Sequence, residues 1–99
     1  MDNFLVQLKG EYAIRKIDNE FYLLPLSNTF IDGSSFYEIT PLAQLILTIL
    51  IKNSSIDSIT LLNMFCDLFP NHDATLIEHD LDIFLHSLMK CGIVTLNEY

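Results

Sequence analysis

The first 40 residues consist of short β-forming runs separated by turn signals, although apolar and polar residues alternate imperfectly within these runs, and this pattern predicts short strands. Residues 12–17 and 21–24 are rich in β-forming side chains, and the dipeptide Asp18-Asn19 separates them. Both residues of this dipeptide tolerate the positive φ of a tight turn, so we expect an antiparallel hairpin. A second turn signal at residues 32–34 precedes another strand at residues 35–39. The pattern predicts a meander of three or four short strands.

The spacing becomes helical at Thr40-Pro41. Thr40 is a good N-cap and Pro41 suits the first helical position, so we expect a helix from there to about residue 53. A second helix is expected after Ser54-Ser55, either of which can cap it, with Asp57 in its first turn. Its predicted buried stripe consists of Ile56, Ile59, Leu62, Phe65 and Cys66. Pro70 lies just beyond its end.

A third helix is expected over about residues 74–91, with Asp73 as its N-cap and Gly92 as the left-handed residue that ends it. Residues 93–96 have the composition of a short strand. On a helical wheel the predicted core face holds Ile77, Leu81, Phe84, Leu85, Leu88, Met89 and Cys91. A separate, narrower line holds Leu76, Asp80, Ile83 and Ser87. This line is either ordinary exposed surface or the wall of a groove, and the wheel alone favours ordinary surface by a small margin.

Strands followed by helices predict an α+β protein, with an N-terminal antiparallel sheet packed on three C-terminal α-helices. The chain has 99 residues, of which 51% are hydrophobic. That length allows one domain over residues 1–99, and that composition allows a buried core.

The charge of the chain excludes some classes of partner. Five Lys and Arg stand against 13 Asp and Glu, for a net charge of −8. Binding to nucleic acid or to an anionic membrane surface requires a cationic patch, so neither is expected. Residues 53–99 carry one basic and seven acidic residues, a net charge of −6. We therefore expect this half to attract a cationic partner.

The sequence has no constellation typical of catalysis or of metal binding. The spacings of His72, His79 and His86 from one another and from Cys66 do not match a zinc site. Cys66 and Cys91 are expected in the core, and glycines only at positions 10, 33 and 92 leave no phosphate-binding loop. We expect no enzyme activity, no cofactor and no metal. No disulfide framework, secretory signal or bilayer-spanning segment is visible, so a reduced, cytoplasmic protein is expected.

An ordered set of motifs over about residues 11–96 resembles the PqqD-like family. These proteins are the recognition elements of ribosomally synthesised, post-translationally modified peptides. The resemblance runs through the two predicted hairpin strands and through residues 36–43. Its most specific part is residues 80–94, where an Asp, Phe-Leu, Leu and Gly with two aliphatic residues recur at the family's spacing. The chain departs from the family at residues 39–43, where Thr40 replaces an Asn, and at Lys52-Asn53, which replaces Asp-Gly.

The resemblance implies a winged-helix-like fold and a non-catalytic peptide chaperone. Such a protein binds the leader segment of a precursor peptide as an added strand and presents it to a modifying enzyme, such as a radical-SAM enzyme, a cyclase or a protease. By this resemblance the peptide-binding residues are Ser35, Phe36, Tyr37, Glu38 and Ile39 along the sheet edge, and Leu76, Asp80, Ile83 and Ser87 on the third helix. The sequence leaves open which of Phe36 and Tyr37, on opposite faces of one strand, meets the peptide.

Two other functions remain open. The chain could be a winged-helix-like docking or regulatory subunit that binds a partner protein. DNA binding, the other function open to such a fold, is disfavoured by the acidic third helix. It could also form a homodimer through the sheet edge, because an unprotected edge strand tends to self-associate. The product class and the partner enzyme are not encoded in any motif.

Overall fold

The computed structural model describes residues 2–26 and 37–98, and it divides into two compact units. Residues 8–54 form one, which we call the hairpin unit, and residues 1–7 with 55–99 form the other, the helical unit. Each unit is described by itself. The described residues include three helices and two three-stranded sheets, so the predicted α+β class is confirmed. The single domain expected over residues 1–99 stays a prediction.

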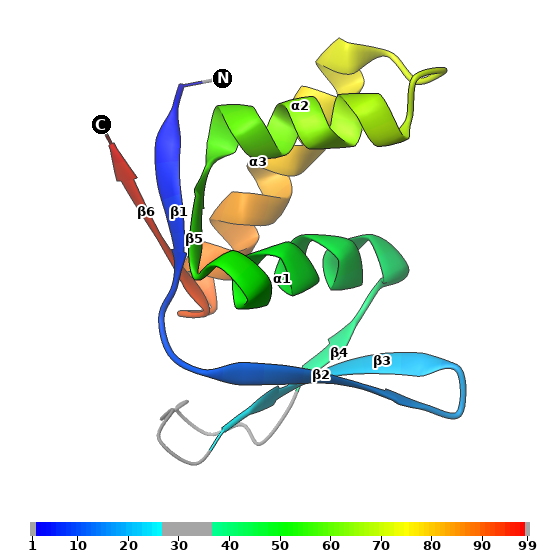
Figure 1. Cartoon of the computed structure of the whole chain (residues 1–99), viewed down its shortest axis with the longest axis vertical. Coiled ribbons are helices and arrows are strands. Elements are labelled where there is room, and N and C mark those ends of the chain that lie inside the picture. The colour runs from blue at the N-terminus through cyan, green and yellow to red at the C-terminus, as the bar shows by residue number, and fades with distance from the viewer. Residues whose placement is uncertain (1, 27–36, 99) are drawn as a thin grey trace. The chain divides into compact units, whose positions relative to one another are not determined.

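The sheet of the hairpin unit is antiparallel, in the order β2-β3-β4. Its strands are β2 (Tyr12–Ile17), β3 (Glu20–Pro25) and β4 (Tyr37–Ile39). Asp18 and Asn19 connect β2 to β3 with φ values of 50° and 70°, which confirms the predicted tight hairpin. Figure 1 shows this hairpin as the long blue and cyan ribbon. Residues 35 and 36 and the expected turn at 32–34 lie outside the described residues.

Helix α1 (Pro41–Asn53) follows β4 directly. The predicted cap is confirmed, because the Thr40 hydroxyl accepts a hydrogen bond of 3.1 Å from the Ala43 N–H. The left-handed residue that ends the helix is Ser54, with φ of 64°. The core of the hairpin unit consists of Tyr12 and Leu23 from the sheet with Ala43, Ile46, Leu47 and Leu50 from α1.

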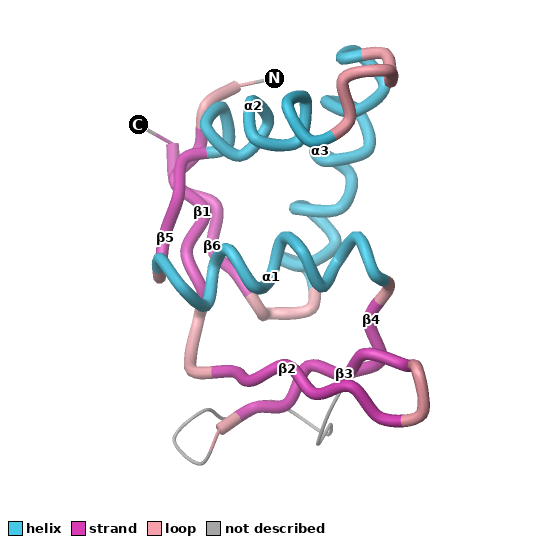
Figure 2. Tube along the Cα trace, turned by 45° about the vertical axis from the view of Figure 1, so that its right-hand side comes forward, coloured by secondary structure: helices cyan, strands magenta, loops and turns pink. Residues whose placement is uncertain are grey.

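The helical unit contains a second sheet, of which the sequence pattern predicted one strand. Its central strand is β1 (Phe4–Leu8), between β5 (Ser55–Asp57) and β6 (Val94–Glu98). These three strands lie side by side in Figures 1 and 2. Only the strand near residues 93–96 was expected. The pairing of β1 with β5 joins residues as distant as Leu5 and Asp57, which no local pattern reveals.

Helix α2 (Ser58–Leu68) begins two or three residues later than predicted, depending on whether Ser55 or Ser54 is taken as the expected cap. The N-cap is Asp57, whose carboxylate accepts hydrogen bonds from the Thr60 N–H at 3.0 Å and from the Thr60 hydroxyl at 2.6 Å. These bonds lower the pKa of Asp57. Because residues 55–57 pair with β1, the helix begins later and the buried positions shift. They are Ser58, Leu61 and Phe65, whereas Ile56, Ile59, Leu62 and Cys66 are half-buried.

Helix α3 (Ala74–Lys90) begins and ends as predicted. Asp73 caps it by accepting a 2.8 Å hydrogen bond from the Thr75 N–H, and Gly92 adopts a φ of 78°. Leu81, Leu85 and Leu88 are buried, as the wheel indicates. Met89 and Cys91 are exposed, against expectation, because they lie at the two margins of the predicted core sector. None of the described helices is both long and apolar enough to cross a bilayer.

The N-terminal segment is tied to the start of α2 by a buried serine. Ser58 is fully buried, and its hydroxyl accepts a 2.8 Å hydrogen bond from the Phe4 N–H. The same hydroxyl lies 3.2 Å from the Asp2 carbonyl oxygen, and the Asn3 side chain accepts from the Ile59 N–H at 3.1 Å. The start of β1 is therefore fixed to the helix by polar contacts.

Replacing Ser58 with alanine should destabilise the protein by about 1–3 kcal/mol, because the partly buried Phe4 N–H loses its hydrogen-bond partner. Urea denaturation followed by far-UV circular dichroism measures this loss. The matched control is Ser87→Ala, which removes an exposed hydroxyl and should change stability by about 0.5 kcal/mol or less. Equal stability of the two variants would contradict the buried-serine account.

Candidate functional site

Strand β4 lies at one edge of its sheet among the described strands. Its one hydrogen-bonded neighbour among the described strands is β3, with Tyr37 opposite Leu23 and Ile39 opposite Phe21. Tyr37 and Ile39 are half-buried, whereas Glu38, on the other face, is exposed. Of the five predicted edge residues, Tyr37, Glu38 and Ile39 therefore form a strand. Ser35 and Phe36 lie outside the described residues.

A buried hydroxyl lies on the face of the sheet that carries Tyr37. Tyr12 is 4% exposed, and its hydroxyl has no hydrogen-bond partner in the described part of the chain. Burial raises the pKa of Tyr12, and the neighbouring Tyr37 adds to the shift. The Tyr12 hydroxyl therefore stays protonated at neutral pH.

The opposite face of the sheet carries a pair of carboxyl groups near the edge. Glu38 stands opposite Tyr22, which places it diagonally across from Glu20 on the same face. A hydrogen bond between the two glutamate side chains raises the pKa of Glu38, and their mutual repulsion and some desolvation add to the shift. Sequence reasoning singled out Glu38 but not its partner. Two acidic side chains therefore lie close together on this face of the sheet beside the edge.

The four residues predicted on the third helix lie on one exposed face of α3. Leu76 is 61% exposed and Ile83 is 53% exposed, and Asp80 and Ser87 are exposed beside them. The Ser87 hydroxyl donates a 2.9 Å hydrogen bond to the Ile83 carbonyl of its own helix. We call these four residues the α3 line. They belong to the helical unit and the β4 residues to the hairpin unit, so the two halves of the predicted groove are each formed within a separate unit.

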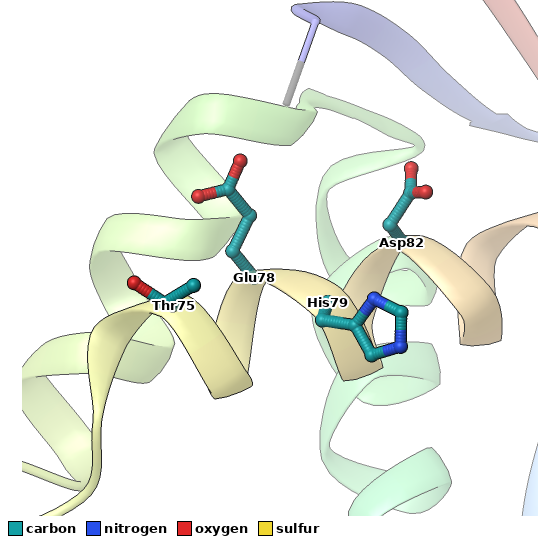
Figure 3. Close-up of a pocket in the computed structure, with 4 residues that line it drawn as sticks. All are labelled: Thr75, Glu78, His79 and Asp82. Atoms are coloured by element: carbon teal, nitrogen blue, oxygen red, sulfur yellow. The ribbon is translucent and has the colours of Figure 1, made fainter.

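A pocket of about 300 Å³ lies on another face of α3. Figure 3 shows its four lining residues, Thr75, Glu78, His79 and Asp82, with both carboxylates projecting from one side of the helix and the His79 ring turned elsewhere. His86 Nδ1 lies 3.4 Å from an Asp82 carboxylate oxygen, but both side chains are more than 40% exposed, so the pair contributes little. Within the described ranges no three metal-binding side chains are grouped closely enough to hold an ion.

A second pocket, of about 380 Å³, lies in the hairpin unit. It is lined by Ile14, Lys16, Phe21, Gln44, Thr48 and Ile51. The sequence pattern did not reveal it, because residues from β2, β3 and α1 meet only in the folded chain. The signal that could have been read is the hairpin turn, which sets Lys16 opposite Phe21.

Comparison with known protein families, curated protein sequences and solved structures finds no match for this chain. The resemblance to the PqqD-like family therefore rests on the sequence motifs alone. The fold and the candidate site define an α+β protein in which β4 is an edge strand among the described strands and an apolar line on α3 is exposed.

The repulsion between the two glutamates should make stability depend on pH. Because the folded-state pKa of Glu38 lies above its ordinary value of 4.5, the folded chain holds this proton more tightly than the unfolded chain does. This contribution to stability is present at low pH and is lost as the pH rises from about 4.5 through the raised pKa.

Glu38→Gln keeps a hydrogen-bonding side chain beside Glu20 without the second negative charge. The variant should have a higher urea midpoint than the wild type at pH 7 and about the same midpoint at pH 4. Glu98→Gln, a change to an exposed glutamate of β6, is the control and should leave the difference between the two pH values as in the wild type. A Glu38→Gln protein with the wild-type pH dependence would contradict the coupling.

Proposed function

We propose that this chain is a non-catalytic peptide chaperone that binds the leader segment of a ribosomally made precursor peptide. The observation that carries the proposal is the β4 edge, which has one strand neighbour in the described part of the chain. An extended peptide adds to such an edge through main-chain hydrogen bonds, and the side chains beside it set its register. The resemblance to the PqqD-like family supports the same mode of binding.

The α3 line supplies the apolar contact that this mode needs. Leu76 and Ile83 are both more than half exposed, and burying a large aliphatic side chain completely is worth about 1.5–3 kcal/mol. Covering the remaining exposed parts of both side chains would therefore contribute about 2 kcal/mol. Main-chain hydrogen bonds alone discriminate poorly between sequences, so in this proposal the α3 line gives the leader its specificity.

The distribution of charge favours a basic or neutral leader. Residues 1–7 and 55–99 carry one basic and eight acidic residues, for a net charge of −7 on the helical unit. Glu20 and Glu38 add negative charge beside the edge strand. Association with a basic leader is steered by this field and should weaken as salt is added.

In this proposal the protein acts in the cytoplasm together with a separate modifying enzyme. A radical-SAM enzyme, a cyclase and a protease all fit, because the chain supplies recognition and the enzyme supplies the chemistry.

A second candidate is a docking subunit that binds a partner protein. It is favoured by the exposed apolar side chains on both helices of the helical unit, Leu68 at 56%, Leu76 at 61% and Ile83 at 53%. Such a subunit would purify with its partner and would not need a precursor peptide. A winged-helix-like DNA regulator is disfavoured because the helical unit would repel phosphate.

Ile83→Asp should weaken leader binding at least tenfold, because a carboxylate would replace the apolar contact. Isothermal titration calorimetry with the N-terminal half of the short peptide encoded beside the gene measures this change. Wild-type dissociation constants of about 10 nM to 10 μM are expected. The matched control is Leu68→Asp, which adds the same charge at an equally exposed position of α2 and should preserve most of the affinity.

Equal binding by Ile83→Asp and wild type would remove the α3 line from the site. A folded, monodisperse wild-type protein that does not bind this leader would overturn the proposed function in favour of the docking subunit.

A further inference from the structure

The pocket of the hairpin unit is an open depression with an apolar floor. Ile14, Phe21 and Ile51 supply the apolar atoms, and none of the six lining residues is buried. Its volume of about 380 Å³ is at the lower end of the range for ligand pockets. A small molecule is usually held with most of its surface buried, which an open depression of this kind cannot provide. A side chain carried on a partner's chain fits it better.

The pocket is built from both strands of the hairpin and from one face of α1. Lys16 and Phe21 are paired across β2 and β3, and the Lys16 ammonium lies 5.8 Å from the centre of the Phe21 ring. This cation–π contact holds the ammonium beside the apolar floor. Gln44, Thr48 and Ile51 are spaced by four and three residues, so they share one face of α1, on which Ile51 belongs to the apolar floor and Gln44 and Thr48 form the polar wall.

The wall formed by α1 carries no charge, and its two polar side chains, Gln44 and Thr48, are hydrogen-bonded to each other. The Gln44 side-chain amide donates a 3.0 Å hydrogen bond to the Thr48 hydroxyl, which donates at 2.7 Å to the Gln44 carbonyl oxygen. Of the six described lining residues, Lys16 is the one that carries a charge. Its ammonium forms no ion pair with any carboxylate of residues 2–26 or 37–98.

We propose that this pocket binds an apolar side chain of an acidic peptide segment, with a neighbouring carboxylate of that segment paired to Lys16. The apolar side chain would rest on Ile14, Phe21 and Ile51. A phenylalanine or leucine flanked by aspartate or glutamate has this chemistry. The site is distinct from the β4 edge and the α3 line, and the proposal does not depend on leader binding.

The distribution of charge between the two units supports an acidic occupant. Residues 8–54 carry four basic and five acidic residues, a net charge of −1, against −7 for the helical unit. An acidic segment is repelled by the helical unit and meets the least repulsion on the hairpin unit.

The test is a titration of the full-length, ¹⁵N-labelled protein with short acetylated and amidated peptides, followed by amide chemical shifts. The probe is Gly-Asp-Phe-Asp-Gly, and the two comparison peptides are Gly-Lys-Phe-Lys-Gly and Gly-Asp-Ala-Asp-Gly. We expect the probe to shift amides of the six lining residues and to bind about tenfold more tightly than either comparison peptide. We expect Lys16→Met to weaken binding about threefold, the range of an exposed ion pair. Lys52→Met removes an exposed cation that lies on α1 and does not line the pocket. This control should leave the affinity for the probe unchanged.

Three results would overturn the proposal. Equal affinity for the aspartate and lysine peptides would remove the role of Lys16, and equal affinity for the phenylalanine and alanine peptides would remove the role of the apolar floor. Shifts that avoid the lining residues, or no shifts at millimolar peptide, would place the segment elsewhere or nowhere. If 3-phenylpropionate bound as tightly as the probe, the pocket would be a small-molecule site and the peptide assignment would be wrong.

Discussion

The two left-handed residues between β2 and β3 determine what the hairpin unit can present. With Asp18 and Asn19 in this conformation, Ile17 stands opposite Glu20 and every later pair in the hairpin follows. A slip of one residue would turn each side chain to the other face of the sheet. Leu23 would leave the core, and Lys16 would no longer face Phe21. The same register carries through β3 to β4, where it sets Tyr37 on the half-buried face and Glu38 on the exposed one.

The two units differ in charge and in the kind of surface they offer. The helical unit is strongly acidic and exposes two aliphatic side chains on one face of α3. The hairpin unit is almost neutral, and its described residues offer an edge strand and a pocket lined by the Lys16 ammonium. The proposed leader peptide and the proposed acidic segment therefore call on different physical forces. The leader peptide would be bound by main-chain hydrogen bonds and apolar burial. The acidic segment would be bound by one apolar side chain and one ion pair.

Sequence reasoning succeeded where the signal was local. The turn at Asp18-Asn19, the cap at Thr40 and the stop at Gly92 each depend on a few adjacent residues, and each is confirmed. It failed where partners are distant along the chain. Strand β5 has only three residues, and its pairing with β1 displaces the start of α2 and makes Asp57 the cap.

In the candidate site, too, the features that depend on neighbouring residues were predicted and those that depend on distant residues were not. The exposed α3 line follows from helical periodicity, so the wheel identified it correctly. Periodicity did not predict that Met89 and Cys91, at the margins of the core face, are exposed, because burial at a margin depends on what packs against it. The Glu20–Glu38 pair and the pocket at Lys16 require the register of three strands and the position of α1, neither of which periodicity supplies.

The central claim is that a leader peptide adds as a strand to β4. Amide hydrogen exchange of the protein, measured by NMR with and without saturating leader peptide, tests it most directly. An added strand forms main-chain hydrogen bonds with the outward-facing amides, so exchange within Tyr37–Ile39 should slow at least tenfold, with smaller changes at β2. Saturated leader binding with unchanged exchange at β4 would contradict strand addition.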